Sequence, residues 1–193
     1  MSEQIQIRDG DALLIVDVQN DFLPGGSLGV PGGDEVVAPL ARCIDVFHRH
    51  GQPIYATRDW HPADHCSFLA QGGPWPPHCV QGTPGAEFAP GLGLPASAMI
   101  VSKASDAARD AYSGFEGTNL AFQLTMYGVK RVFVGGLASD YCVLATVRDA
   151  LKQGLRVYVL NDAIRAVNAD DGARAIAEMT ALGAHFVASG TLA

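Results

Sequence analysis

The chain has 193 residues, a net charge of −7 and 48% hydrophobic residues. A chain of this length usually forms one domain, and its apolar share can fill a core without disulfides or metal, so we expect a single domain spanning residues 1–193. The acidic charge disfavours nucleic acid and anionic membranes as partners.

The first residues are polar, and no apolar run approaches the ~18 residues that a membrane-spanning helix needs. We therefore expect no secretory signal, no membrane contact and a cytoplasmic location. In a reducing compartment the four cysteines are core thiols, ligands or a nucleophile rather than disulfide partners.

Short apolar runs alternate with stretches of helical period along the chain. Residues 12–18 form the first run and are apolar almost throughout, as in a strand covered on both faces. The alternation favours right-handed crossovers and predicts an α/β fold, a doubly wound, mostly parallel sheet with helices on both faces. We expect strands at residues 12–18, 54–57, 99–102, 131–134, 156–160 and 185–188, and helices at residues 34–50, 119–127, 139–153 and 169–182.

Residues 60–97 interrupt this alternation. The segment is rich in Pro, Gly and His and has no strand or helix period. Loops this long are uncommon in compact domains and are often functional. Open α/β sheets bind ligands beyond the carboxyl ends of their strands, where this chain carries Asp17, Asp59, Lys103 and the turn at residues 135–142. We expect the chemistry at that edge, with residues 60–97 as an inserted metal-binding loop.

Cys142 follows a predicted strand and a tight turn, and it lies at the start of a predicted helix. The positive end of the helix dipole would lower the pKa of its thiol, and free N–H groups there could hold an oxyanion. A thiol nucleophile needs a base and a cation, which Asp17 and Lys103 would supply. The alternatives are a buried structural thiol, an acid that pairs at the end of the sheet and a solvated lysine.

A second group of polar residues lies at the start of the long loop and within it. Asp59 and His61 are two positions apart, a spacing that points both side chains the same way in an extended segment, and His78 follows later. One Asp and two His, with water completing the shell, suit zinc, iron or manganese. His65 is a candidate fourth ligand or a neighbour of the shell, and the cysteines at 66 and 79 are weaker candidates. The alternative is a loop of solvated histidines.

Together these segments resemble the nicotinamidases of the isochorismatase-like cysteine hydrolase superfamily, over almost the whole chain. Each motif is weak alone, and their number and order carry the resemblance. In chain order they are DVQNDF at residues 17–22, PGGSL at 24–28, VPGG at 30–33, DWHP at 59–62, WPPHCV at 75–80, YSGF at 112–115 and ASDYCV at 138–143.

The resemblance implies an isochorismatase-like hydrolase fold and a catalytic triad of Asp17, Lys103 and Cys142. It also implies a metal held by Asp59, His61 and His78. It leaves His65 in doubt as a ligand, because some relatives recruit a further ligand at a longer spacing. For the substrate it implies an oxyanion hole from the N–H groups of Ala138 and Cys142, a cis peptide bond before Ala138, and a ring pocket lined by Phe22, Leu28, Trp75 and Tyr112.

The activity implied is hydrolysis of nicotinamide to nicotinate and ammonia through a thioester, with pyrazinamide as a further candidate substrate. One divalent transition metal ion is expected, with zinc ahead of iron or manganese. The main alternative is another amidase of the superfamily, acting on a carbamoyl or ureido substrate. A vinyl-ether-cleaving isochorismatase would lack the nucleophilic cysteine, and a catalytically silent scaffold would not need the triad. Nicotinamide is the expected partner, and a homo-oligomer is left open.

Overall fold

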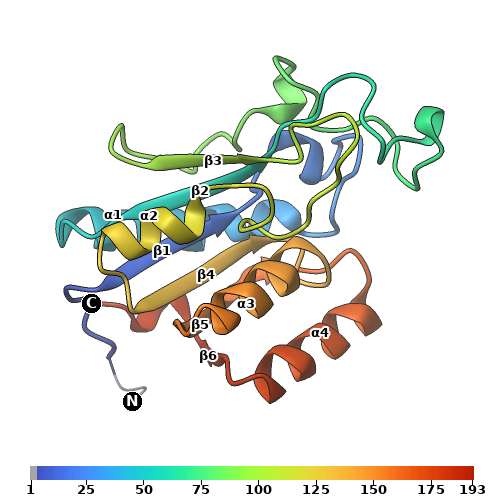
Figure 1. Ribbon diagram of the computed structural model, residues 1–193. Helices are drawn as coiled ribbons and strands as arrows, with labels where there is room; N and C mark the ends of the chain where they lie inside the picture. Colours follow the sequence, from blue (N-terminus) through green and yellow to red (C-terminus); the bar gives the residue numbers. More distant parts are fainter. Residues whose placement is uncertain (1–3) are drawn as a thin grey trace.

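The computed structural model of the protein describes residues 4–193 (Figure 1). Its centre is a six-stranded sheet in the order β3-β2-β1-β4-β5-β6, and every neighbouring pair is parallel. The chain reverses its direction of winding between β1 and β4, so the predicted doubly wound sheet is confirmed. The strands are β1 (Asp11–Val16), β2 (Ile54–Asp59), β3 (Met99–Lys103), β4 (Arg131–Leu137), β5 (Arg156–Arg165) and β6 (His185–Val187).

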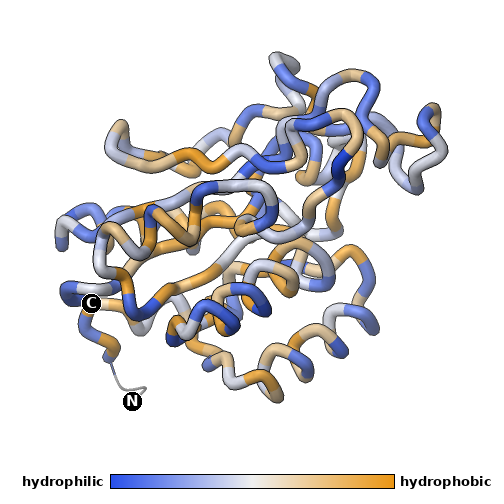
Figure 2. The backbone as a smooth tube through the Cα atoms, viewed as in Figure 1, coloured by the Kyte–Doolittle hydropathy of each residue, from blue (hydrophilic) through white to orange (hydrophobic). Residues whose placement is uncertain are grey.

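The helices cover both faces of the sheet. On one face lies α1 (Val37–Arg49), and on the other lie α2 (Leu120–Met126), α3 (Cys142–Lys152) and α4 (Ala169–Ala181) (Figure 1). Strand β1 contributes to both cores, because Leu13 and Ile15 pack on the α1 side while Leu14 and Val16 pack on the other. Figure 2 shows that the central strands are hydrophobic, as expected of strands that helices cover on both faces.

Two predicted helices begin later than their sequence pattern indicates. The helix expected from residue 34 opens with a 3-10 turn, Gly33–Val36, and becomes α-helical at Val37. The helix expected from residue 139 begins at Cys142, because the residues before it form a turn in which Tyr141 N–H donates to Ala138 O. The consequence is that Cys142 is the first residue of α3.

Strand β4 is longer than predicted and ends in two glycines and a leucine. Gly136 has φ +130°, and a Cβ placed on it would lie 2.0 Å from the carbonyl oxygen of Val16 in β1. Only glycine, which has no Cβ, fits where β4 lies this close to β1. The close contact joins the end of β4 to the end of β1, the two strands that lead to Cys142 and Asp17.

The long loop at residues 60–97 is folded, although it contains no strand of the sheet. It includes the 3-10 turns Leu69–Gln71 and Pro84–Ala86, and single bridges join Gln19 to Phe88 and His61 to Val80. The Gln19–Phe88 bridge joins the loop to the segment that follows β1, and the His61–Val80 bridge lies within the loop itself.

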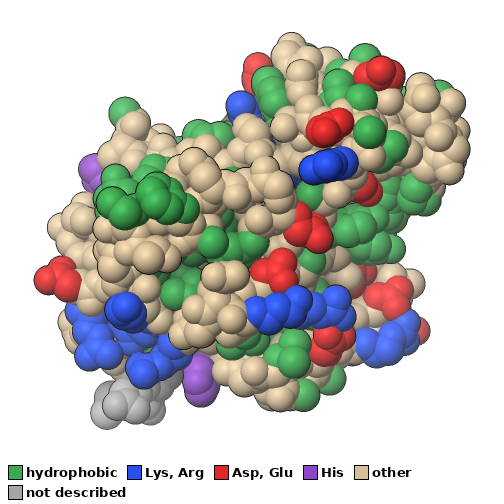
Figure 3. Space-filling view, viewed as in Figure 1, with side chains coloured by type: hydrophobic (Ala, Val, Ile, Leu, Met, Phe, Trp, Pro, Cys, Tyr) green, Lys and Arg blue, Asp and Glu red, His purple; other side chains and the backbone are tan. Residues whose placement is uncertain are grey.

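Helix α2 presents its outer face to solvent. Phe122 and Met126 are both 68% exposed, and Figure 3 shows hydrophobic side chains gathered over this helix.

No helix within residues 4–193 is long and apolar enough to cross a bilayer. The homo-oligomer stays a prediction.

Candidate active site and metal centre

Four polar residues meet at the carboxyl edge of the sheet. Asp17 directly follows β1, Asp59 ends β2, Lys103 ends β3, and Cys142 opens α3 just beyond β4. Asp59 and Lys103 are register partners across the β2–β3 pair. Because the strands are parallel and adjacent, their ends bring together side chains that are far apart in sequence.

The Lys103 ammonium is at the centre of this group, and the residue is only 1% exposed. Its Nζ lies 2.5 Å from Asp59 Oδ1, 3.0 Å from Asp17 Oδ2 and 3.5 Å from Cys142 Sγ. It also donates to the carbonyl oxygen of Ala111 at 3.0 Å. The alternative of a solvated strand-end lysine is therefore wrong, and the three residues proposed as a triad are in contact.

Burial and charge set the protonation states of the two carboxyls around Lys103. Burial favours neutral Lys103, but Asp17 and Asp59 outweigh it and raise the pKa of the ammonium, so it stays charged. Burial also favours neutral Asp59, but Lys103 and His61 together outweigh it and hold the pKa of that carboxyl below its usual range. For Asp17, burial wins over Lys103 and raises the pKa. Asp17 is thus the better proton acceptor of the two carboxylates.

The thiol of Cys142 departs from the sequence-based expectation. Burial raises its pKa well above the ordinary value, Lys103 offsets this only in part, and Asp17 and Asp59 raise it further. The predicted lowering of this pKa is wrong, because a helix dipole is weaker than the burial of the thiol beside two carboxylates. The resting group is a thiol, and it needs a base in contact to become a nucleophile.

The turn before Cys142 supplies backbone donors. The peptide bond between Leu137 and Ala138 is cis, as the resemblance implied. Ser139, Tyr141 and Val143 donate their N–H groups to backbone carbonyls. The N–H groups of Ala138 and Cys142 have no such partner among residues 4–193. They are available to a developing oxyanion.

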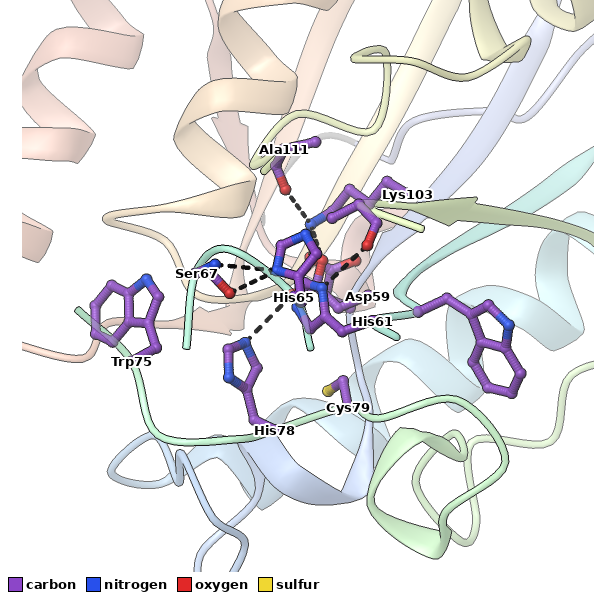
Figure 4. Close-up of polar contacts among 12 residues, drawn as sticks. Asp59, His61, His65, Ser67, Trp75, His78, Cys79, Lys103 and Ala111 are labelled. Carbon is purple, nitrogen blue, oxygen red and sulfur yellow. Dashed lines mark hydrogen bonds and ion pairs between the residues drawn. The ribbon is translucent and has the colours of Figure 1, made fainter. Parts of the chain in front are cut away.

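Asp59, His61 and His78 form a second cluster, whose ligand atoms all lie within 4.8 Å of one another (Figure 4). Asp59 Oδ2 lies 3.6 Å from His61 Nε2 and 4.0 Å from His78 Nε2. Each imidazole directs its Nδ1 to a backbone carbonyl, at 3.1 Å for His61 and 2.8 Å for His78. A carbonyl only accepts, so Nδ1 carries the hydrogen and Nε2 keeps its lone pair.

This donor set fits a divalent metal ion. His61 Nε2 is buried and has no hydrogen-bond partner within the described part of the chain, a cost that a bound cation would remove. Burial lowers the pKa of His78, which keeps its ring neutral as a ligand must be. One carboxylate and two imidazoles leave coordination positions open for water or substrate.

His65 and Cys79 lie beside this cluster without joining it. His65 uses both ring nitrogens within the protein, Nδ1 with Ser67 Oγ at 2.7 Å and Nε2 with Arg109 O at 2.9 Å, and it packs against His61 (Figure 4). The Cys79 thiol is fully buried, and it is not among the ligand atoms that lie within 4.8 Å of one another. Their places indicate that they support the loop.

One pocket is lined by residues of both clusters. Trp75 and Tyr112 form part of its wall, and the indole N–H donates to the phenol oxygen at 3.1 Å. Tyr141 packs against Trp75 with ring centroids 5.4 Å apart. The sequence named five of its lining residues as the substrate pocket and three more as metal ligands or nucleophile, and it missed three. Those named as the pocket are Phe22, Leu28, Trp75, Tyr112 and Ala138, those missed are Val30, Tyr141 and Val167, and Asp59, His78 and Cys142 complete the wall.

Comparison with known proteins gives consistent matches over most of the chain. The family model described as Isochorismatase domain matches residues 11–190. The nicotinamidase of Escherichia coli (strain K12) is 41% identical over 196 residues, which cover 90% of this chain and 92% of the relative.

Solved structures agree with the sequence matches. A pyrazinamidase of Pyrococcus horikoshii in complex with zinc superimposes with a TM-score of 0.91 at 51% identity, covering 93% of this chain and 99% of that one. PnC1 from L. infantum in complex with nicotinate gives a TM-score of 0.88 at 39% identity, covering 98% of both chains.

Proposed function

Because the chain belongs to the Isochorismatase domain family, we propose that it is a nicotinamidase, an amidohydrolase that converts nicotinamide to nicotinate and ammonia in NAD salvage. One observation carries this proposal: a single cavity contacts the Cys142 thiol and also the metal-ligand residues Asp59 and His78. Nicotinamide carries a carboxamide and a ring nitrogen on one flat ring, so its carboxamide can contact Cys142 while its ring nitrogen faces the metal-ligand residues. The relatives that bind zinc and nicotinate support the assignment.

In the first half of the reaction, Cys142 attacks the carboxamide carbon. Asp17 takes the thiol proton, and its raised pKa suits that role. The S–C bond forms, and the carbonyl oxygen becomes an oxyanion on the N–H groups of Ala138 and Cys142. Asp17 then returns the proton to the leaving nitrogen, the C–N bond breaks, and ammonia departs.

In the second half, water hydrolyses the thioester. Asp17 accepts a proton from the attacking water as the water oxygen bonds to the acyl carbon. The S–C bond then breaks, the proton passes from Asp17 back to Cys142, and the released acid loses its own proton to solvent as nicotinate. Lys103 stays protonated throughout, because two carboxylates raise its pKa. Its charge lies 3.5 Å from Sγ, where it stabilises the thiolate in both halves.

We propose that Asp59, His61 and His78 hold zinc, with iron or manganese as alternatives. A bound divalent metal supplies a Lewis-acid contact for the pyridine nitrogen. The chain's own contribution is to keep both Nε2 lone pairs aimed inward and to hold the ring between Phe22 and Trp75. This orients the carboxamide toward Cys142.

Ammonia release by the purified protein tests the function. We expect nicotinamide to be hydrolysed rapidly, pyrazinamide also to be hydrolysed, and a carbamoyl amide without a ring nitrogen to be a poor substrate. Faster hydrolysis of the carbamoyl amide would instead favour the alternative amidase. We place the reaction in the cytoplasm, where the four cysteines, all free in the structure, would stay reduced.

A further inference from the structure

We propose that Thr57 is a positioning residue for proton transfer, and that its hydroxyl fixes which oxygen of Asp17 receives the proton of Cys142. The inference rests on the proposed nicotinamidase function and extends it to a residue that contacts no substrate. Thr57 lies in β2 and is completely buried.

Thr57 holds Asp17 at both its backbone and its side chain. The Thr57 hydroxyl donates to Asp17 Oδ1 at 2.6 Å. The Thr57 carbonyl accepts the Asp17 backbone N–H at 3.2 Å, and the same N–H lies 3.3 Å from Thr57 Oγ1. Asp17 has φ +49°, in the left-handed region that non-glycine residues rarely adopt, and the contacts with Thr57 help to hold this conformation.

These contacts leave the two carboxylate oxygens in different states. Oδ1 is occupied by the Thr57 hydroxyl. Oδ2 is buried, lies 3.0 Å from Lys103 Nζ and has no hydrogen-bond partner within residues 4–193. The three hydrogens of Lys103 have other acceptors, which are Asp59 Oδ1, Ala111 O and Cys142 Sγ. Oδ2 is therefore the oxygen whose lone pairs accept no hydrogen bond within the described chain, which makes it the better acceptor for a proton.

The proton path follows from this difference. The Cys142 thiol gives its proton to Asp17 Oδ2 as the S–C bond forms, and Oδ2 passes that proton to the nitrogen as the C–N bond breaks. Without the Thr57 hydroxyl the carboxylate can rotate, and Oδ1 competes for the Lys103 hydrogens. Proton transfer then starts from a poorer geometry, although the substrate pocket is unchanged.

Two substitutions separate the hydroxyl from the methyl group of Thr57. The methyl packs under Gly114, where an added Cβ would lie 2.8 Å from Thr57 Cγ2. Thr57→Val keeps that packing and removes the hydroxyl, whereas Thr57→Ser keeps the hydroxyl and removes the methyl. Thr146→Val is the matched control, because it removes another fully buried threonine hydroxyl, one that accepts from Gly114 N–H rather than contacting Asp17.

We expect Thr57→Val to lower kcat for nicotinamide by roughly 10- to 100-fold, with KM and the Kd of nicotinate within about twofold of wild type. Thr57→Ser should recover most of the kcat even if its Tm falls. Thr146→Val should lower Tm and keep kcat within about twofold. A kcat for Thr57→Val within about threefold of wild type would overturn the proposal, as would a Thr57→Ser variant as slow as Thr57→Val.

A substrate-independent readout keeps this test separate from that of the function. Iodoacetamide alkylation of Cys142, followed by mass spectrometry, should be slower in Thr57→Val than in wild type and restored in Thr57→Ser. If the wild type releases no ammonia from nicotinamide, the proposed function fails while alkylation still decides the role of Thr57. Equal alkylation rates in all three proteins would contradict the role even in an active enzyme.

Discussion

Lys103 places one positive charge among Asp17, Asp59 and Cys142, and Asp59 connects that charge to the metal centre. Asp59 directs Oδ1 to Lys103 and Oδ2 to His61 and His78. Gln19 holds the Asp59 backbone in place, since its amide accepts from Asp59 N–H and donates to Asp59 O, both at 2.8 Å. A single carboxylate thus belongs to both clusters, and its substitution should damage both.

The metal centre gives a prediction at this scale. Purified protein should contain about one transition-metal ion per chain, and His61→Ala should lose it, because the buried Nε2 lone pair disappears. His65→Ala should keep the metal, because both of its ring nitrogens are already bonded within the protein. Elemental analysis after dialysis measures the metal content of the two variants and of the wild type.

His48→Ala serves as a control, because this histidine is exposed on α1. The ligand assignment would fail if His61→Ala retained the full metal content. Equal losses in His61→Ala and His65→Ala would show instead that the whole loop, rather than a particular nitrogen, governs binding.

At the scale of elements, the junction of β4 and β1 positions the catalytic residues. Gly136→Ala would force a Cβ to 2.0 Å from Val16 O, at a backbone φ of +130°. Backbone cannot yield as a flexible side chain can, so we expect a loss of several kcal/mol in the free energy of unfolding, or no folded protein. Urea denaturation of the wild type and of Gly136→Ala measures this loss in the free energy of unfolding.

Gly51→Ala is the matched comparison. Gly51 also has a positive φ, +66°, but an added Cβ there would meet nothing within 4 Å. The cost should be only about 1 kcal/mol, from the left-handed backbone alone. Similar losses in the two variants would mean that the close approach of β4 to β1 is not what requires glycine.

The sequence could predict which elements form but not how the turn before α3 is built. The alternation of apolar runs and helical periods gave every strand of the sheet, because that pattern reflects burial on one or two faces. The start of α3 at Cys142 depends on bonds such as Ser139 N–H to Arg165 O, which join distant segments. No local propensity encodes such a contact.

At the scale of the whole molecule, the family motifs located the candidate site, while its electrostatics needed the fold. The raised pKa of Cys142 comes from burial together with Asp17 and Asp59, which reach it from other strands. Val167 lines the cavity because its N–H donates to Asp140, a residue of the turn before α3. Thr57 gave no signal in sequence, since a threonine in a strand is ordinary.

Buried thiols make the stability of the molecule sensitive to alkaline pH. Burial raises the pKa of Cys43 from 9.0 to about 12. A folded pKa above the unfolded one means that this stability is complete below pH 9 and is lost as the pH rises toward 12. By pH 10 the loss from this thiol should reach about 1.4 kcal/mol.

Urea midpoints measured between pH 8 and pH 10.5 test this, in wild type and in Cys43→Ala. The variant should be less stable at pH 8, because it leaves a small cavity, and its stability should fall less steeply with pH. Parallel pH profiles for the two proteins would show that Cys43 does not contribute.

The covalent intermediate on Cys142 is the central claim of the mechanism. Rapid quenching of the enzyme with nicotinamide, followed by digestion and mass spectrometry, should show a nicotinoyl group on the peptide that contains Cys142. The same experiment with Cys142→Ala should show no adduct and no ammonia release, while the fold stays intact. An adduct on Cys66 or Cys79, or steady turnover by the Cys142→Ala variant, would contradict the account.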